Sequence, residues 1–342
     1  MHDQISLPSG GRSICLDVIL HMKTITNISI ILMTVISCNS QESKSNTWNH
    51  HVHIFSQNLL TDLRGEKSGS ELIQGPDYLY SNIDTIMSKV IADNIALIST
   101  GYGYKKELKS QEELASLIKY ENDNLLEAYK KYKDRIFPFI GIDPTESYAI
   151  EEVKRCNKLF DKFGIKLHFH SSKIELLNPN EIKIIKPIFD YAIVENIPLL
   201  IHFKNHQDDF GEKHINSFFD NLISPKNPLT IIFAHTGGDG IINSKTEETV
   251  RTILRLNKEY KQNIFFEIST AIWSKYIKQY EIEDDKKQEL INEIGINRIL
   301  YGTDYPAREF KSYYNLLKYR LKFTDGELNT IRTNSPLNEY AR

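Results

Sequence analysis

Eight short runs rich in β-branched and aromatic residues alternate with amphipathic stretches along most of this chain, and this alternation constrains its fold more than any other feature. Short, almost wholly apolar runs are typical of strands that are buried on both faces, as in parallel sheets. The sequence predicts strands at residues 48–53, 95–100, 136–142, 165–168, 198–202, 230–235, 264–268 and 298–302. The stretches between them predict helices at residues 114–132, 148–163, 181–195, 246–261 and 284–293.

Eight strands that alternate with helices indicate a (β/α)8 TIM barrel, because the helices supply the crossovers that parallel pairing requires. A doubly wound open sheet is the alternative, since a sequence does not show whether a sheet closes. Gly101-Tyr102-Gly103 follows the second predicted strand but lacks the third glycine of a dinucleotide-binding loop. No obvious linker follows residue 47, so we expect residues 48–342 to form one domain.

The beginning of the chain has the pattern of a targeting signal. Met22-Lys23 precedes an apolar stretch at residues 28–36, and Ser37-Cys38 follows it. A basic start, a short apolar run and a small residue before the break are typical of a secretory signal, and Val35-Ile36-Ser37-Cys38 is similar to the bacterial lipobox. The alternative is a buried apolar helix.

We therefore predict that the protein is exported and anchored to a membrane through a lipid on Cys38, in the periplasm or at the cell surface. The expected divisions are an extension before the true start (1–21), a lipoprotein signal peptide (22–37) and a polar tether (38–47). Cys156 would then be the single cysteine of the mature domain, which excludes an intramolecular disulfide.

The charge of the chain excludes one class of partner. With 42 basic and 45 acidic side chains the net charge is -3, which gives no electrostatic reason to expect nucleic acid. We expect a small-molecule substrate instead, and a homo-oligomer remains open.

Residues that bind metals occur at the ends of several predicted strands. His51 and His53 lie two apart and share one face of the first strand. His202, His235 and Asp304 end the fifth, sixth and eighth strands. Because the C-terminal ends of barrel strands converge on one mouth, these side chains are expected to meet in one pocket.

This set of residues suits one divalent metal ion. Neutral imidazoles and a carboxylate bind zinc and its first-row neighbours, so we expect zinc, with manganese as the alternative. His51, His53, His202 and Asp304 are the predicted ligands. Asp304 could also take a proton from a metal-activated water, and His235 is the predicted acid or base. The alternative is a set of core or loop residues without a shared role.

At these points the chain resembles the amidohydrolase superfamily, and within it the amidohydrolase-related family of decarboxylases and lactonases. The resemblance is carried by residues 49–53, 164–168, 198–202, 233–238 and 301–306. It implies a distorted (β/α)8 barrel, with the metal ligands of the family at His51, His53, His202 and Asp304. One position departs from the family pattern, because Asn49 stands where an aspartate is common.

Two further residues are candidates for substrate binding. Lys166, on the fourth strand, could contact the substrate; a bridging carbamate between two metals or a lysine packed along its stem are the alternatives. Arg308 could clamp a substrate carboxylate with its guanidinium, or lie on a surface helix.

Other residues near the predicted strand ends are weaker candidates. His168 and His170 could join the site, but a loop start explains them better. His206 and His214 are expected on the surface, and Trp273 and Tyr102 in the core, with the pocket as the alternative for both aromatics. The segment 57–80, which follows the first strand, is expected over the mouth as the loop that selects the substrate.

The predicted function is hydrolysis of a small amide, lactone or ester by metal-activated water. Nonoxidative decarboxylation of a small carboxylic acid is the alternative within the same fold. A noncatalytic binding lipoprotein is the alternative from another class.

Overall fold

A computed structural model describes residues 46–65, 73, 75–104, 106, 109–205, 209–269 and 282–340. The chain divides into two units, Met1–Ser43 and Lys44–Arg342. The predicted extension, signal peptide and lipidated Cys38 lie outside the described residues, as does the tether up to residue 45, so export and anchoring stay predictions. Among the helices of the described part, none is long and apolar enough to cross a membrane.

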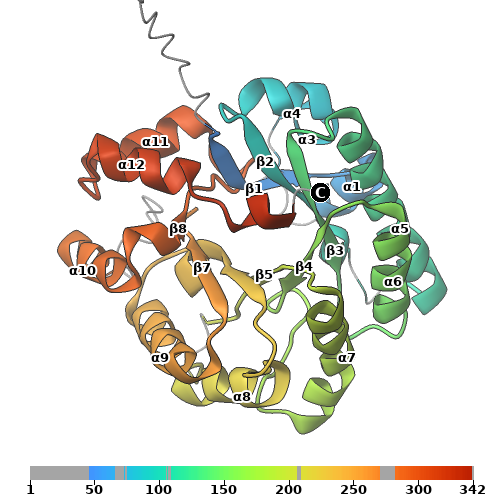
Figure 1. Cartoon of the computed structure of the whole chain (residues 1–342). Coiled ribbons are helices and arrows are strands. Elements are labelled where there is room, and N and C mark those ends of the chain that lie inside the picture. The colour runs from blue at the N-terminus through green and yellow to red at the C-terminus, as the bar shows by residue number, and fades with distance from the viewer. Residues whose placement is uncertain are drawn as a thin grey trace, which may run out of the picture. The chain divides into compact units, whose positions relative to one another are not determined.

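Eight parallel strands form the centre of the second unit, and each pairs with the next in chain order. Backbone hydrogen bonds from His50 N to Tyr301 O and from His53 N to Tyr305 O then connect the segment of β8 to β1, so the barrel is nearly closed (Figure 1). The predicted barrel is therefore confirmed. Its strands are β1 (Trp48–Ile54), β2 (Asn94–Ser99), β3 (Ile136–Ile142), β4 (Gly164–His168), β5 (Leu199–His202), β6 (Thr230–Phe233), β7 (Asn263–Glu267) and β8 (Ile299–Leu300).

Helices surround the strands (Figure 1). Several begin at side chains that cap their first turn, such as Ser110, whose hydroxyl accepts from Glu113 N, and Asn243, whose amide oxygen accepts from Thr246 N. All five predicted helices are present, with α8, α11 and α12 in addition. The helices outside the segment 57–89 are α5 (Gln111–Lys131), α6 (Ala149–Leu159), α7 (Pro179–Glu195), α8 (Glu212–Leu222), α9 (Ser244–Tyr260), α10 (Asp284–Ile294), α11 (Phe310–Tyr319) and α12 (Asp325–Thr333).

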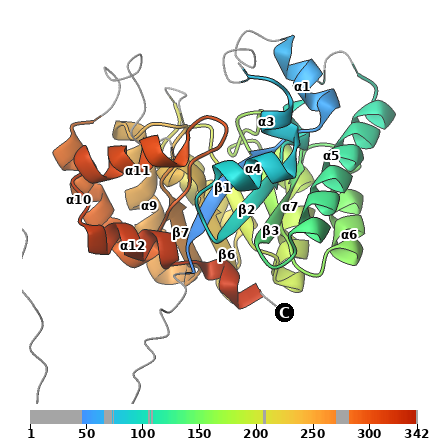
Figure 2. The ribbon, with the colours of Figure 1, turned by 90° about the horizontal axis from the view of Figure 1, so that it is seen from above.

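The segment after β1 contains helices rather than the continuous loop that the sequence suggested. These are α1 (Gln57–Arg64), α3 (Tyr78–Ser81) and α4 (Ile83–Lys89), and Ser56 caps α1 by accepting from Leu59 N. Figure 2 shows α1 and α3 at one end of the barrel and the C-terminal segment at the other. The N-cap of α1 is also tied to α5, because Ser56 N donates to Glu121 Oε2 over 3.0 Å.

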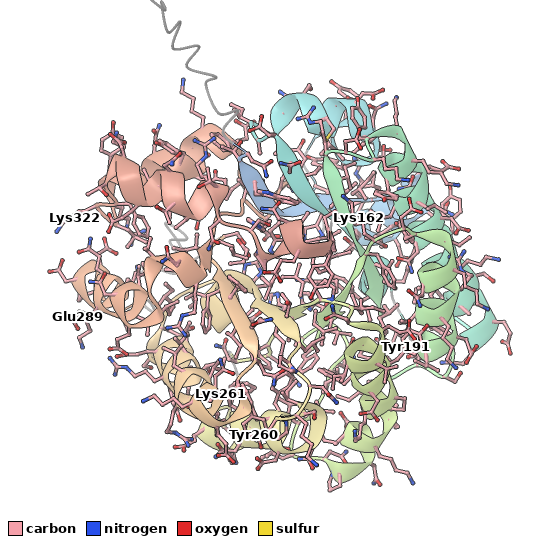
Figure 3. All side chains as sticks on the ribbon, viewed as in Figure 1. Lys162, Tyr191, Tyr260, Lys261, Glu289 and Lys322 are labelled. Carbon is pink, nitrogen blue, oxygen red and sulfur yellow. The ribbon has the colours of Figure 1, made fainter. Side chains whose placement is uncertain are left out.

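The apolar core has two layers because successive strand residues face opposite sides. On β2, Ala96 and Ile98 fill the barrel interior, whereas Ile95 and Leu97 pack against the helices. Leu337, in the last described segment, closes the interior layer. Charged side chains such as Lys261, Glu289 and Lys322 are exposed on the outer surface of the protein (Figure 3).

The same alternation positions the polar residues. On β4, Ile165 and Leu167 belong to the outer layer, so Lys166 and His168 face the interior. On β5, Leu200 fills the interior and His202 follows it on the same side.

Candidate metal centre

Three side chains meet at the mouth of the barrel with the spacing of metal ligands. His51 Nε2 lies 3.2 Å from His53 Nε2, and Asp304 Oδ1 lies 3.3 Å from the first atom and 3.1 Å from the second. Metal–ligand bonds of about 2.0–2.2 Å in tetrahedral or octahedral geometry place neighbouring ligand atoms about 2.9–3.5 Å apart. The three atoms therefore fit around a single ion.

Hydrogen bonds to the other ring nitrogens orient both histidines. His51 Nδ1 donates to Glu267 Oε2 over 2.8 Å, and His53 Nδ1 lies 2.9 Å from Thr100 Oγ1. A neutral His51 that donates from Nδ1 has its lone pair on Nε2, the atom that faces Asp304. This is the arrangement in which a carboxylate fixes the tautomer of a metal-binding histidine.

The protonation states also suit a cation. Burial lowers the pKa of His51 well below its usual value and also lowers the pKa of His53, which favours neutral rings. Burial acts to raise the pKa of Asp304, but His51, His53 and His235 outweigh it and hold the pKa of this carboxyl below its usual range. Neutral imidazoles beside an ionised carboxylate are the donor set expected for zinc or manganese.

Glu267, the hydrogen-bond partner of His51, was not among the residues predicted from the sequence. Its carboxylate is fully buried at the end of β7, and it also accepts from Ser269 N over 2.5 Å and from Ser269 Oγ over 2.8 Å. Gly302 permits this contact, because a Cβ at that position would overlap Glu267 Oε1. The available signal was a single acidic residue that ends an apolar strand.

 His235 lies beside His51 and contacts the same two residues, because Glu267 Oε2 accepts from His235 N over 3.4 Å and Ser269 Oγ lies 3.4 Å from His51 Nδ1. The Nδ1 of His235 lies 3.2 Å from the Ser269 carbonyl oxygen and 2.9 Å from Ser269 Oγ, so the neutral ring donates from Nδ1. The ring centroid is 5.0 Å from that of His51, and His51, His235 and Asp304 each offer one ligand atom within 4.8 Å of the others.

The backbone at this site adopts left-handed conformations that are uncommon for residues other than glycine. His235, Thr236 and Asp304 have φ angles of 53°, 58° and 54°. Such conformations cost free energy and cluster at functional sites, where the surrounding structure maintains them. Two of the three residues are those predicted to carry the chemistry.

His202 lies in the same cavity but away from the three ligand atoms described above. Its Nε2 is 2.5 Å from Asp239 Oδ1, and its ring centroid is 4.7 Å from that of His235. Asp239 was not singled out in the sequence; it lies in the loop after β6 and also contacts His170 Nδ1 at 3.2 Å. The role of His202 as a fourth ligand stays a prediction.

A cavity of about 280 Å³ opens in front of these residues. Apolar side chains and hydrogen-bond donors share its walls, and of the two charged residues in the lining Lys166, with a relative exposure of 1%, is more deeply buried than Asp304. Its Nζ has no hydrogen-bond partner among the described residues. Burial lowers the pKa of Lys166 to about 8, against the opposing effect of Asp304 and Glu267. The lining residues are His51, His53, Phe55, Leu63, Thr100, Tyr102, Gly103, Lys166, His168, Ser171, His202, His235, Asp304, Pro306 and Ala307.

Asn49, which departs from the aspartate expected at this position, makes three hydrogen bonds. Its Nδ2 donates to Thr303 Oγ1 over 2.8 Å, while its Oδ1 accepts from Thr303 N over 3.1 Å and from His51 N over 3.2 Å. The neutral amide therefore joins β1 to the segment after β8, directly beside two of the predicted ligands.

The remaining candidates are dispersed. Arg308 is half-buried and does not line the cavity, although Pro306 and Ala307 do, so its role as a clamp stays a prediction. His214 is buried and stacks on Phe210, rather than lying on the surface as expected. Tyr102 is buried and also lines the cavity. His206 and Trp273 lie outside the described residues.

Comparison with known proteins identifies the family. The sequence model of the amidohydrolase family matches residues 104–331, which is more than half of the chain. The chain belongs to this family. No curated protein sequence matches it.

Solved structures with the same fold include decarboxylases and a hydratase. A dihydroxybenzoic acid decarboxylase from Polaromonas sp. JS666, with bound manganese and 2-nitroresorcinol, is 16% identical with a TM-score of 0.54, over 86% of this chain and 96% of that chain. A 5-carboxyvanillate decarboxylase from Novosphingobium aromaticivorans, with manganese and 4-hydroxy-3-methoxy-5-nitrobenzoic acid, is 15% identical with a TM-score of 0.57, over 86% and 95%. The 4-oxalomesaconate hydratase from Rhodopseudomonas palustris is 14% identical with a TM-score of 0.52, over 86% and 95%.

Proposed function

We propose that this amidohydrolase-family protein is a metal-dependent enzyme that removes a carboxyl group nonoxidatively from a small aromatic or unsaturated carboxylic acid. The observation that carries the proposal is the convergence of His51 Nε2, His53 Nε2 and Asp304 Oδ1 within 3.1–3.3 Å of one another at the cavity. The decarboxylases named above support the choice of reaction.

The metal site would consist of His51, His53 and Asp304, and the Nε2 of His202 would have to leave Asp239 to serve as the predicted fourth ligand. A divalent ion bound there supplies a Lewis acid for a substrate oxygen. Zinc was the ion expected from the sequence, and the manganese in two of the solved structures supports manganese equally.

The reaction breaks one carbon–carbon bond and leaves its electron pair on the substrate. The carboxylate departs as neutral carbon dioxide, and the carbon that remains takes up one proton. His235 is the proposed proton carrier: Ser269 holds the hydrogen on its Nδ1, so Nε2, on the ring that lies beside His51, would take up a proton from solvent and pass it to the carbon. The buried walls of the cavity favour this step, since a carboxylate removed from water loses the hydration that stabilises it.

Hydrolysis, the first prediction from the sequence, uses the same ligands. Its support is the family match alone, whereas decarboxylation is supported by the family match and by two of the solved structures. The two reactions differ in their products, because decarboxylation releases carbon dioxide and hydrolysis consumes water.

The test combines metal analysis with a substrate panel. Protein loaded with zinc or manganese is incubated with dihydroxybenzoates, 5-carboxyvanillate, and a set of lactones, amides and esters, and both carbon dioxide and hydrolysis products are measured. We expect about one equivalent of metal and carbon dioxide from at least one acid, and in Asp304→Asn both the metal affinity and the rate of carbon dioxide release should fall by at least about 100-fold.

The matched control is Asp285→Asn, which removes an exposed carboxylate at the start of α10 and should leave both values unchanged. Metal-dependent hydrolysis without carbon dioxide would replace this proposal with the hydrolase. Full metal binding by Asp304→Asn would contradict the assigned site.

A further inference from the structure

Lys166 is the buried charge that the proposed reaction leaves unexplained. The residue lines the cavity, and its buried ammonium lacks a hydrogen-bond partner among the described residues. Asp304 and Glu267 act on it electrostatically, but neither is hydrogen-bonded to it. An unpaired cation withdrawn from water is costly, and a ligand that brings an anionic group into the cavity would remove that cost.

His168 offers a second donor on the same inner face of β4. Ser171 N donates to His168 Nδ1 over 3.1 Å, so the neutral ring has its hydrogen on Nε2. The ring is held between Tyr102, with centroids 4.9 Å apart, and His202, with centroids 4.0 Å apart. This stacking fixes the direction of the donor before any ligand arrives.

Decarboxylation determines which substrate group belongs at such a site. The leaving carboxylate loses its negative charge as it becomes carbon dioxide. An ion pair with this group would therefore stabilise the starting acid more than the transition state, and would slow the reaction. A cation assists only where a substrate group keeps or gains negative charge.

We infer that Lys166 and His168 form a subsite for a carboxylate that stays on the product, so that the substrate is a compact dicarboxylic acid. The inference rests on the proposed decarboxylation. The products are carbon dioxide and a monocarboxylate, and one proton is taken up at the carbon from which carbon dioxide departs.

The position and size of the cavity agree with this class of substrate. β4, which carries the subsite, lies four strands away from β8, which precedes Asp304, so these two strands are on opposite sides of the ring of eight (Figure 1). A volume of about 280 Å³ is small for a ligand cavity, and such cavities typically measure roughly 300–1,000 Å³. A single ring or a short unsaturated chain with a carboxylate at each end fits these limits.

Binding without turnover tests the subsite directly. Calorimetry compares isophthalate with benzoate, and fumarate with crotonate, on the full chain loaded with manganese and again after treatment with a chelator. Each diacid should bind about 10–100-fold more tightly than its monoacid in the wild type. Lys166→Met should abolish this preference, and His168→Gln should reduce it.

Lys183→Gln is the matched control, because Lys183 is exposed on α7 outside the cavity lining, and it should keep the preference. Thermal unfolding and manganese content show whether each variant is folded. If Lys166→Met does not fold, His168→Gln decides the result.

Equal affinity for the diacid and the monoacid in the wild type would overturn the subsite, as would a preference that survives in both variants. Carbon dioxide release is measured separately. A preference that depends on Lys166, together with no carbon dioxide from any acid, would count against the decarboxylase and leave the carboxylate subsite standing. Carbon dioxide release without a preference for the diacid would support the decarboxylase and overturn the carboxylate subsite.

Discussion

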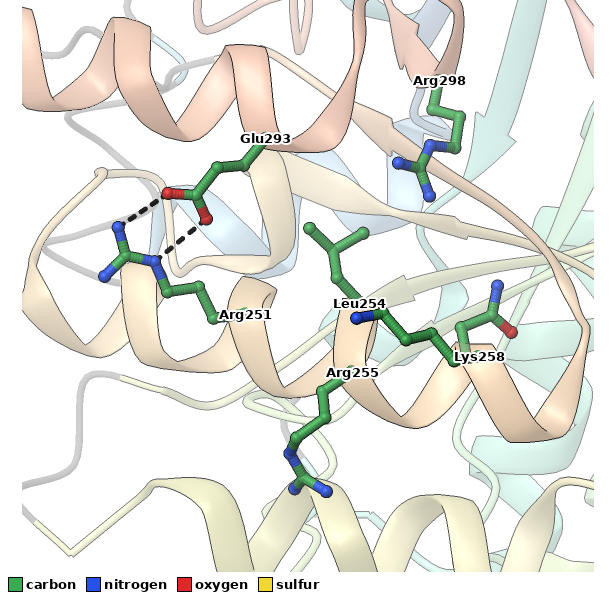
Figure 4. Close-up of a pocket in the computed structure, with 7 residues that line it drawn as sticks. Arg251, Leu254, Arg255, Lys258, Glu293 and Arg298 are labelled. Atoms are coloured by element: carbon green, nitrogen blue, oxygen red, sulfur yellow. Dashed lines mark hydrogen bonds and ion pairs between the residues drawn. The ribbon is translucent and has the colours of Figure 1, made fainter.

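The cavity at the barrel mouth and a groove on the outer surface differ in how their charges are satisfied. The outer groove, between α9 and the segment from α10 to β8, has a volume of about 470 Å³, compared with about 280 Å³ for the cavity. In the groove, Arg251 and Glu293 form a two-pronged ion pair with N–O distances of 2.8 and 3.0 Å (Figure 4). The lining residues are Arg251, Leu254, Arg255, Asn257, Lys258, Glu293 and Arg298.

The smaller cavity contains a buried charge that lacks compensation. Lys166 Nζ is buried without a hydrogen bond in the described structure, and three electron-rich ligand atoms face one another. Exposed ion pairs such as Arg251–Glu293 are screened by water and stabilise little. The comparison indicates that a buried charge without a hydrogen bond, beside converging ligand atoms, marks this candidate site better than volume does.

The largest expected contrast is in stability, at Lys166. The pKa of this lysine is about 8 in the folded protein and about 10.4 in an unfolded chain, so the folded state binds fewer protons between these values. Its charge therefore lowers stability below pH 8, and this penalty declines as the pH rises from 8 to about 10.4. The shift corresponds to roughly 3 kcal/mol.

Lys166→Met removes the charge with a side chain of similar shape. In metal-free protein at pH 7, denaturant unfolding should show the variant to be more stable than the wild type by up to roughly 3 kcal/mol, with the difference shrinking toward pH 10. Lys258→Met, in the exposed wall of the groove, should show no such pH-dependent difference. A destabilised Lys166→Met at pH 7 would mean that the ammonium is compensated.

The second contrast is between Glu267 in the cavity, which accepts from His51, and Glu293 in the outer groove, which accepts from Arg251. Glu267 is buried against His51, and its negative charge favours the tautomer of His51 that donates from Nδ1. An uncharged amide at this position would favour that tautomer less. Glu267→Gln should weaken metal binding by about 10–100-fold, because such outer partners typically contribute this much. Competition with a chelating dye measures the affinity, and an unchanged value would show that Glu267 is only structural.

Sequence patterns predicted the scaffold because strand burial and helix periodicity are local properties. All eight strands and five of the helices were predicted from residue patterns alone. The helix α1 was missed because its eight residues are too few for a long apolar stripe, and the contact that ties its N-cap to α5 comes from Glu121, 65 positions away in the chain.

The residues that line the cavity were predicted where they lie at the C-terminal ends of strands, because these ends converge in a barrel. His51, His53, Lys166, His202, His235 and Asp304 all line it, as that rule requires. Glu267 and Asp239 were not predicted, because their partners are 216 and 37 positions away and no spacing in the sequence pairs them. Which groups orient the ligands depends on side-chain geometry across the barrel rather than on the order of residues.

The smallest expected effect is at Glu293, the counterpart of Glu267 in the outer groove. Glu293→Gln removes one partner of Arg251, but Arg251 keeps its ion pair with Glu247 at 2.8 Å, and half of its side chain is exposed. The free energy of unfolding should change by less than about 1 kcal/mol, and metal affinity should not change at all. Denaturant unfolding and the same dye competition measure both quantities beside Glu267→Gln. A metal affinity that falls equally in the two variants would show that the cavity and the groove are coupled through the barrel, and would remove the distinction between buried and exposed carboxylates on which the comparison depends.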